Sequence, residues 1–185
     1  MKVFISPHND DETLFGAFTL LRERPVVVIV YDSYVQTKRG ITGCGWAERR
    51  AETWNALGEL GLDDALHLGM GDDLEYRPDQ IRSRLGEVLG GLHRVESAWA
   101  PAPEANGHVQ HNLVGIACQG LPDLTRYLTY TAAGKSTSDK PVTMGGSRWI
   151  AAKLRALACY RSQMSLDPRL GCWPHFLRDQ TEYYL

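Results

Sequence analysis

Short continuous apolar runs alternate along the chain with longer segments whose apolar side chains recur at helical spacing. The runs KVFIS (residues 2–6) and VVVIVY (26–31) are rich in β-branched side chains. Such runs are typical of strands buried on both faces of a parallel sheet. Residues 12–23, between them, carry apolar side chains at helical spacing. This order predicts a strand, a helix and a second strand at the start of an α/β fold.

The same alternation continues through the rest of the chain. Further helices are predicted by helical periodicity at residues 46–60, 78–92, 111–121 and 148–163. Further strands are predicted at residues 65–68, 98–100 and 126–131. The pattern indicates a three-layer α/β sandwich, with helices on both faces of a mostly parallel sheet. The insert at residues 32–45 leaves the end of a strand, which favours a functional loop, and residues 132–141 are predicted to be a polar loop.

Composition narrows the class of protein. With 185 residues, of which 43% are hydrophobic and 23% charged, the chain predicts one globular domain spanning residues 1–185. The net charge of −2 provides no basic excess, so the composition favours a small-molecule partner over an extended nucleic-acid surface. No apolar run is long enough to span a bilayer. The sequence assigns no oligomeric state.

The cysteines indicate a cellular location. They are far apart, form no CxxC pair and follow no N-terminal signal sequence: Cys44, Cys118, Cys159 and Cys172. Reduced thiols in the cytoplasm are therefore predicted.

Side chains that can bind a metal follow two of the predicted strands. ISPHNDDETLFGA places His8, Asp10 and Asp11 after the first strand, and PAPEANGHVQHNLVG places His108 and His111 after residues 98–100. Ligands of a wound α/β sheet bind at the carboxyl ends of its strands, so these side chains are expected at one edge. Two histidines and one carboxylate are a known ligand set for a divalent metal that leaves a position for water.

A purely structural interpretation of the first stretch is also open. Asn9 or Asp10 can cap the following helix, while Asp11 and Glu12 complement its dipole.

Four motifs together resemble one protein family. PHNDDETLFGA is similar to the PHPDDE motif, and HVQH to the HPDH motif, of the LmbE-like or PIG-L family of metal-dependent N-deacetylases. RRAETWNALGELG (49–61) resembles the family's R-x-x-E helix, and LRALACYRSQ (154–163) its late helix ending in Ser-Gln. The resemblance implies a Rossmann-like domain that removes an acetyl group from an N-acetylated amino sugar such as N-acetylglucosamine, a sugar conjugate or a related acylamide.

The resemblance also implies roles for individual residues. His8, Asp11 and His111 would bind zinc, with Fe²⁺ or another divalent metal as alternatives, Asp10 would be the general base, and His108 would be a second catalytic group. Zinc suits amide hydrolysis because it lowers the pKa of bound water and polarises the carbonyl.

Two further positions match substrate-binding positions of the family. Arg49 corresponds to a helix arginine that contacts substrate, and Asp72 in LGMGDD to an acidic residue that can bind a sugar hydroxyl. The alternative for Arg49 is a solvated helix residue paired with Glu52.

The chain departs from the family pattern at two positions. Asn9 stands where the family has proline, and Gln110 where it has aspartate. A neutral Gln110 can orient His108 but cannot favour its imidazolium form, which predicts a lower His108 pKa than in relatives with aspartate.

Two other functional classes stay open. The scaffold could be a metal-free ligand-binding domain, or a non-haem iron enzyme, because two histidines and a carboxylate also form that iron site.

Overall fold

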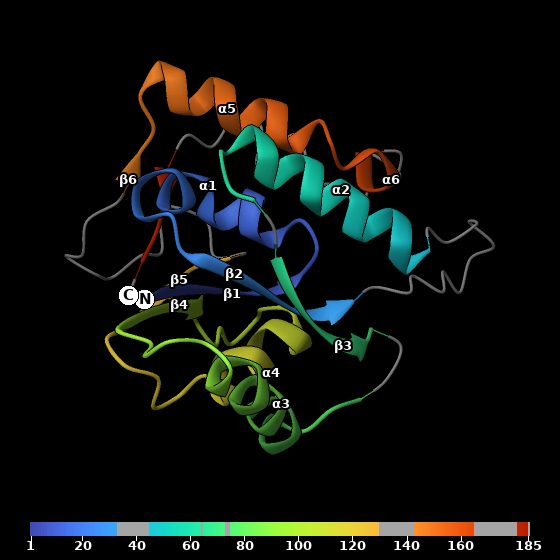
Figure 1. Cartoon of the computed structure of the whole chain (residues 1–185), viewed down its shortest axis with the longest axis vertical. Coiled ribbons are helices and arrows are strands. Elements are labelled where there is room, and N and C mark those ends of the chain that lie inside the picture. Colours follow the sequence, from blue (N-terminus) through green and yellow to red (C-terminus); the bar gives the residue numbers. More distant parts are fainter. Residues whose placement is uncertain (33–44, 64, 73–74, 130–142, 165–180, 185) are drawn as a thin grey trace.

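The computed structural model describes residues 1–32, 45–63, 65–72, 75–129, 143–164 and 181–184. A central sheet lies between two layers of helices (Figure 1). The strands of this sheet are β1 (Lys2–His8), β2 (Val26–Asp32), β3 (Ala65–Gly71), β4 (Ser97–Pro101) and β5 (Leu124–Tyr127). The helices are α1 (Asp11–Glu23), α2 (Trp46–Glu59), α3 (Pro78–Gly90), α4 (Val109–Ala117), α5 (Ser147–Leu157) and α6 (Arg161–Met164). A separate antiparallel pair consists of β6 (Thr143–Met144) and β7 (Thr181–Glu182).

The five strands are all parallel and lie in the order β3-β2-β1-β4-β5. The chain builds outward from β1 through β2 to β3 and then crosses back to place β4 on the other side of β1. The order of strands therefore reverses between β1 and β4, and this is the place where open α/β sheets bind ligands. The predicted α/β class with a parallel sheet is confirmed.

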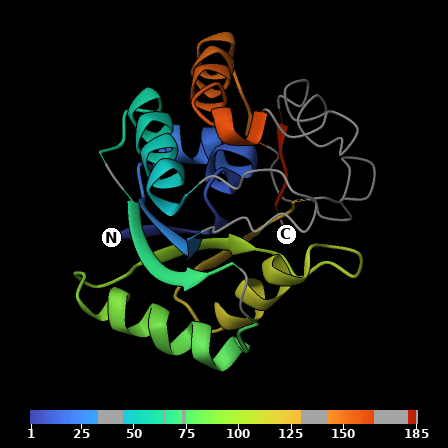
Figure 2. The same ribbon diagram turned by 90° about the vertical axis from the view of Figure 1, so that its right-hand side faces the viewer.

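Each face of the sheet has its own hydrophobic core because successive strand side chains point to opposite faces. Phe4 packs with apolar residues of α1, α2 and α5 on one face. Val3 and Ile5, its neighbours in β1, pack with apolar residues of α3 and α4 on the other. Figure 2 shows these two helix layers on opposite sides of the sheet.

Helix α1 packs on the ring of Phe4 in β1 through Gly16. A Cβ atom added at Gly16 would lie 2.3 Å from Cζ of Phe4, so only glycine permits this packing. Asp10 is the N-cap residue of this helix and Asp11 is its first residue.

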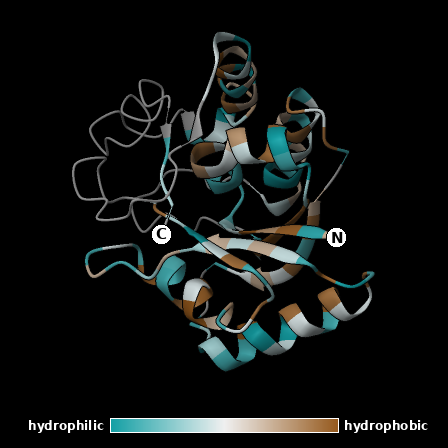
Figure 3. Ribbon diagram, turned by 90° about the vertical axis from the view of Figure 1, so that its left-hand side faces the viewer, coloured by the Kyte–Doolittle hydropathy of each residue, from teal (hydrophilic) through white to brown (hydrophobic). Residues whose placement is uncertain are grey.

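Several predicted elements have different bounds in the structure: the predicted helix over residues 111–121 is α4, over Val109–Ala117, and the predicted strand over 65–68 extends to Gly71 in β3. The predicted helix over residues 148–163 is divided into α5 and α6, and the predicted strand over 126–131 begins earlier, at Leu124, and ends at Tyr127. Residues 33–44 of the predicted functional insert and the loop at 132–141 lie outside the described residues. Hydrophobic and hydrophilic residues are mixed along the helices (Figure 3), and no described helix is both long and apolar enough to cross a membrane.

Candidate active site

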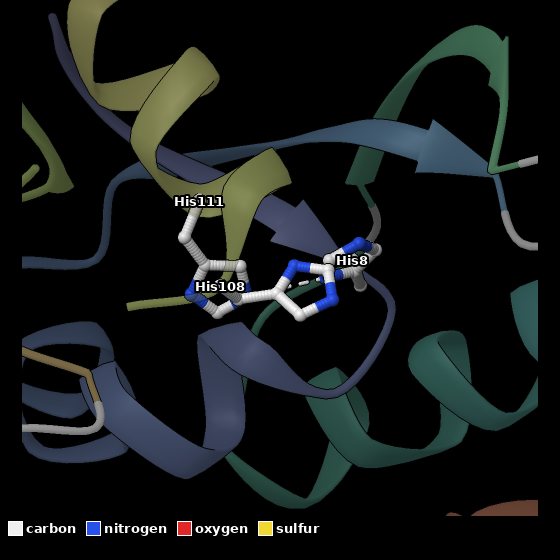
Figure 4. Close-up of side chains that lie close together, drawn as sticks. All are labelled: His8, His108 and His111. Carbon is white, nitrogen blue, oxygen red and sulfur yellow. Dashed lines mark hydrogen bonds between the residues drawn. The ribbon is translucent and has the colours of Figure 1, made fainter. Parts of the chain in front are cut away.

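The predicted metal ligands meet where the order of strands reverses. His8 is the last residue of β1, and Asp11 is the first residue of α1. His111 lies in the first turn of α4, the helix that follows β4. Figure 4 shows His8, His108 and His111 gathered at this point, although about 100 residues of chain separate His8 from the other two.

Three side-chain atoms form a small triangle. Oδ2 of Asp11 lies 3.0 Å from Nδ1 of His8 and 2.9 Å from Nε2 of His111. The two imidazole nitrogens lie 3.2 Å apart, a contact marked by the dashed line in Figure 4. Ligand atoms bound tetrahedrally to one zinc ion at about 2.0–2.1 Å lie about 3.3 Å apart. The donor set and its spacing therefore fit a divalent cation.

The triangle is buried, and its charges support one another. Asp11 and His111 are almost fully buried. Burial opposes the charge on Asp11, but His111 and His8 outweigh it and hold the pKa of its carboxyl well below the usual range. Burial likewise opposes protonation of His8, but hydrogen bonds with Asp11 and Asp72 raise the pKa of His8 to about 10. Asp11 is therefore an ionised carboxylate, the form that binds a cation.

A second set of groups holds the far side of the His8 ring. Nε2 of His8 lies 2.8 Å from Oε1 of Gln110 and 3.5 Å from Oδ1 of Asp72. The amide of Gln110 also donates to the Asp72 carbonyl at 3.0 Å. If a metal displaces the proton from Nδ1, an Nε2–H that donates to Gln110 leaves the lone pair of Nδ1 pointing at the triangle. The Gln110 amide was expected to orient His108, but its hydrogen bonds go to His8 and Asp72 instead.

Asp10 lies beside the triangle with a carboxylate that is not one of its three corners. It is 9% exposed, and its Oδ2 lies 3.4 Å from Nη2 of Arg49. Burial raises the pKa of Asp10 to about 7, opposed by Arg49 and assisted by Asp11 and Glu12. The backbone of Asp10 has φ 121° and ψ −34°, a region that residues with a Cβ rarely adopt. The side chain caps no helix through a hydrogen bond, so the capping interpretation of Asp10 is not supported.

His108 is the exposed member of the histidine cluster. It is the N-cap residue of α4, and its ring centroid lies 5.3 Å from those of His8 and His111. Partial burial lowers the pKa of His108, and the neighbouring His8 and His111 lower it further. A nitrogen of His108 also lies within 4.8 Å of those of the other two histidines. His108 is therefore the histidine of this cluster that is most accessible to solvent.

The two predicted substrate-binding residues, Arg49 and Asp72, have different surroundings: Arg49 is buried, whereas Asp72 lines a cavity. Arg49 is 2% exposed, and its guanidinium donates to the carbonyl of Asn9 behind Asp10, so it is not a solvated residue. Asp72 lies on the far side of His8. It lines a cavity of about 530 Å³ that is otherwise formed mainly by α3, α4 and their flanking residues. The other lining residues are Tyr31, Glu75, Tyr76, Arg77, Pro78, Val109, Gln110 and Leu113.

Sequence reasoning missed two residues of the surroundings. Glu12 accepts a hydrogen bond from the backbone N–H of Asp10, and Tyr160 donates to the same Glu12 carboxylate. Both belong to motifs that are visible in the sequence, HNDDE and CYRSQ. Their spatial relation was not visible, because Tyr160 lies 148 residues away from Glu12.

Comparisons with known proteins agree with this picture. The model of the family described as GlcNAc-PI de-N-acetylase (PIG-L) matches residues 3–119, which confirms the resemblance inferred from the motifs. The Ser-Gln motif of residues 154–163 lies beyond the matched part. No curated protein sequence matches the chain.

Several solved structures share the fold. The chain is similar to N,N'-diacetylchitobiose deacetylase from Pyrococcus horikoshii, with a TM-score of 0.74, 19% identity and coverage of 100% of this chain and 82% of that one. It is similar to the conserved protein TT1542 from Thermus thermophilus, with a TM-score of 0.69, 23% identity and coverage of 100% and 93%. It is also similar to the zinc-inhibited form of teicoplanin deacetylase Orf2, with a TM-score of 0.70, 16% identity and coverage of 97% and 89%. At these identities the likeness shows the fold.

Proposed function

Because the chain belongs to the GlcNAc-PI de-N-acetylase (PIG-L) family, we propose that it is a metal-dependent hydrolase that removes the acetyl group from an N-acetylated amino sugar or sugar conjugate. The observation that carries the proposal is the triangle of His8, Asp11 and His111 with the carboxylate of Asp10 beside it. Zinc is the proposed metal, with Fe²⁺ or another divalent ion as alternatives.

Each residue of the site has a chemical task in this proposal. A zinc ion held by His8, Asp11 and His111 would supply an acidified water and a polarised amide carbonyl. Asp10 is proposed as the general base. Its carboxylate lies next to the proposed ligand Asp11 but is not itself one of the three donor groups. In hydrolysis the C–N bond breaks, and the proton accepted by Asp10 is available for the leaving amine.

His108 is proposed as the second catalytic group. It is the exposed residue of the cluster, and its ring centroid lies 5.3 Å from those of His8 and His111. From there its imidazole can donate a hydrogen bond to the oxygen that becomes negative as water adds to the amide carbon.

Asp72 is the proposed contact for a sugar hydroxyl, because its carboxylate lines the cavity next to His8. Contact of Arg49 with substrate stays a prediction. Its burial favours a role behind Asp10. We also propose that the 185 residues form a single deacetylase domain, and its cytoplasmic location stays a prediction from the cysteines.

The test is release of acetate and free amine from N-acetylglucosamine and N,N'-diacetylchitobiose by the purified chain. Asp10→Ala is expected to lower kcat by about 10²–10⁴-fold while the protein retains its metal. His111→Ala is expected to lose both metal and activity, whereas His93→Ala, at an exposed histidine away from the site, retains both. Full activity of Asp10→Ala would refute the assigned base.

The same preparations separate the alternatives. A metal-free binding domain would contain no stoichiometric metal in the wild-type chain. A non-haem iron oxygenase would lose activity without dioxygen, whereas a hydrolase keeps it under strictly anaerobic conditions.

A further inference from the structure

Asp10 has a backbone conformation that requires support from its surroundings. Its φ of 121° lies in a region that L side chains rarely adopt, because the Cβ atom crowds the neighbouring peptide groups. A non-glycine residue stays in such a region only when its surroundings fix it there, and such residues cluster at functional sites. The groups that bind the peptide of Asp10 therefore determine where its carboxylate points.

The peptide groups of Asp10 are fixed on both sides. Its carbonyl accepts from the N–H groups of Thr13 at 3.0 Å and Leu14 at 2.9 Å, as the residue before a helix normally does. Its N–H donates to Oε2 of Glu12 at 3.0 Å. This second bond is specific to this turn, because it uses a side chain only two residues ahead. Glu12 is fully buried, so no water competes for its carboxylate.

The Glu12 carboxylate is in turn held by its neighbour Thr13 and by the distant Tyr160. Its Oε1 accepts hydrogen bonds from the hydroxyl of Tyr160 and from Oγ1 of Thr13, the latter at 2.9 Å. Tyr160 lies between α5 and α6 and is fully buried. The start of α6 is fixed to α2, because Glu52 accepts from the backbone N–H and the hydroxyl of Ser162 at 2.7 and 2.6 Å.

We infer that Glu12 and Tyr160 are positioning residues for Asp10: Tyr160 fixes the Glu12 carboxylate, and Glu12 fixes the strained peptide that aims Asp10 at the reaction centre. The catalytic part of this inference rests on the proposed function. The conformational part does not, so the two can be tested separately.

The conformational test compares glycine with alanine at position 10. Asp10→Gly and Asp10→Ala both lack the carboxylate, and only glycine accepts φ 121° without strain. We expect Asp10→Gly to unfold about 2–6 °C above Asp10→Ala. If Glu12 imposes the conformation, this difference disappears or reverses in a Glu12→Ala background, where the peptide relaxes. An unchanged difference would overturn the inference.

If Glu12→Ala does not fold, the same comparison of glycine with alanine at position 10 can be made in two more conservative variants, Tyr160→Phe and Tyr127→Phe. Tyr160→Phe removes only the hydroxyl that anchors Glu12. Tyr127→Phe is the matched control, because Tyr127 is also fully buried and its hydroxyl donates to the β1 carbonyl of Ile5 at 2.8 Å. The glycine–alanine difference is expected to shrink in Tyr160→Phe and to persist in Tyr127→Phe. Equal behaviour of the two tyrosine variants would exclude the role of Tyr160.

The catalytic test is a double-mutant cycle on deacetylation of the sugar that the wild-type chain hydrolyses fastest. Glu12→Ala is expected to lower kcat about 100-fold with KM within about twofold, because a misplaced base costs roughly that much. Glu12→Gln, which keeps an acceptor for the Asp10 N–H, is expected to restore most of the rate. In an Asp10→Ala background, Glu12→Ala is expected to have no further effect.

The outcomes distinguish the inference from the proposed function. If the Glu12 and Asp10 effects on kcat multiply, Glu12 does not act through Asp10 and the inference is overturned. If the wild-type chain hydrolyses none of the sugars, the proposed function fails. The unfolding comparison at position 10 then still decides whether Glu12 and Tyr160 hold the strained peptide.

Discussion

Removal of the Gln110 side chain should weaken metal binding without touching a metal ligand. Gln110 Oε1 lies 2.8 Å from Nε2 of His8, and its amide nitrogen donates to the carbonyl of Asp72. The side chain therefore holds the His8 ring in the orientation that points Nδ1 at Asp11. In Gln110→Ala the ring loses this partner and must be ordered when the metal binds.

The size of the effect follows from the groups that remain. Loss of the outer partner of a metal-ligating histidine lowers metal affinity about 10–100-fold, or about 1.4–2.8 kcal/mol. Oδ1 of Asp72 lies 3.5 Å from the same Nε2, so a small movement would let it accept the N–H in place of Gln110. We therefore expect the lower end, about tenfold, for Gln110→Ala. The double variant Gln110→Ala/Asp72→Ala should lose more metal-binding free energy than the sum of the losses in the two single variants.

The assay is a zinc titration of metal-free protein in competition with a chromophoric chelator. Asn112→Ala is the matched control, because Asn112 lies two residues further along α4 and its amide also makes two hydrogen bonds, both to the backbone of Glu104 at 2.8 Å. Both variants should lose similar unfolding free energy, about 1–3 kcal/mol without metal, but only Gln110→Ala should lose zinc affinity. Equal zinc affinity of Gln110→Ala and wild type would refute this role of Gln110.

Two further predictions concern the fold around the site. Gly16→Ala should lower the unfolding free energy by about 2–3 kcal/mol in urea titrations, because the new methyl group collides with the buried ring of Phe4. Gly58→Ala, in open space on α2, should instead raise it by about 0.5–1 kcal/mol, and equal signs would contradict the argument. Burial would raise the pKa of Asp32, but hydrogen bonds from His67 and an arginine of α2 lower it. A carboxyl group with a lowered pKa in the folded state stabilises the fold at pH values above its unfolded pKa of about 3.9, and this stabilisation is lost as the pH falls. The unfolding free energy of the wild type should therefore exceed that of Asp32→Asn most at about pH 7 and least below about pH 4. A gap that widens in acid would exclude this sign.

The strands and helices that flank the site could be predicted because their local patterns agree with their burial. Continuous β-branched runs became β1 and β2, each buried on both faces, and the periodic segment between them became α1. The division of the late helix could not be predicted, since residues 148–163 are periodic throughout. The break falls where Tyr160 binds Glu12 and where Ser162 binds Glu52, and these contacts with distant residues are not part of a local pattern.

The motifs predict which histidines and carboxylates meet at the candidate site, but not the hydrogen-bond partners of these side chains. The sequence predicts that Gln110 orients His108, its neighbour at i−2, but residues two apart do not face each other at a helix start. The side chain instead reaches His8 at the end of β1. The sequence predicts that Arg49 either contacts substrate or is a solvated residue paired with Glu52. Its burial beside Asn9 depends on how α2 packs near the end of β1.

Three consecutive acidic residues at the start of α1 have different pKa values because they contact different parts of the chain. Burial would raise the pKa of all three. At Asp11 two histidines outweigh burial and keep the carboxylate ionised. At Asp10 Arg49 opposes burial only in part, and the pKa rises to about 7. At Glu12 burial also raises the pKa, although the hydrogen bond from Tyr160 opposes it. Neighbouring carboxyl groups with separated pKa values are how a site assigns one acid to a charge and another to proton transfer. The three acidic residues of HNDDE therefore have different environments because each contacts a different part of the chain: Asp11 contacts α4, Asp10 contacts α2, and Glu12 contacts the segment before α6.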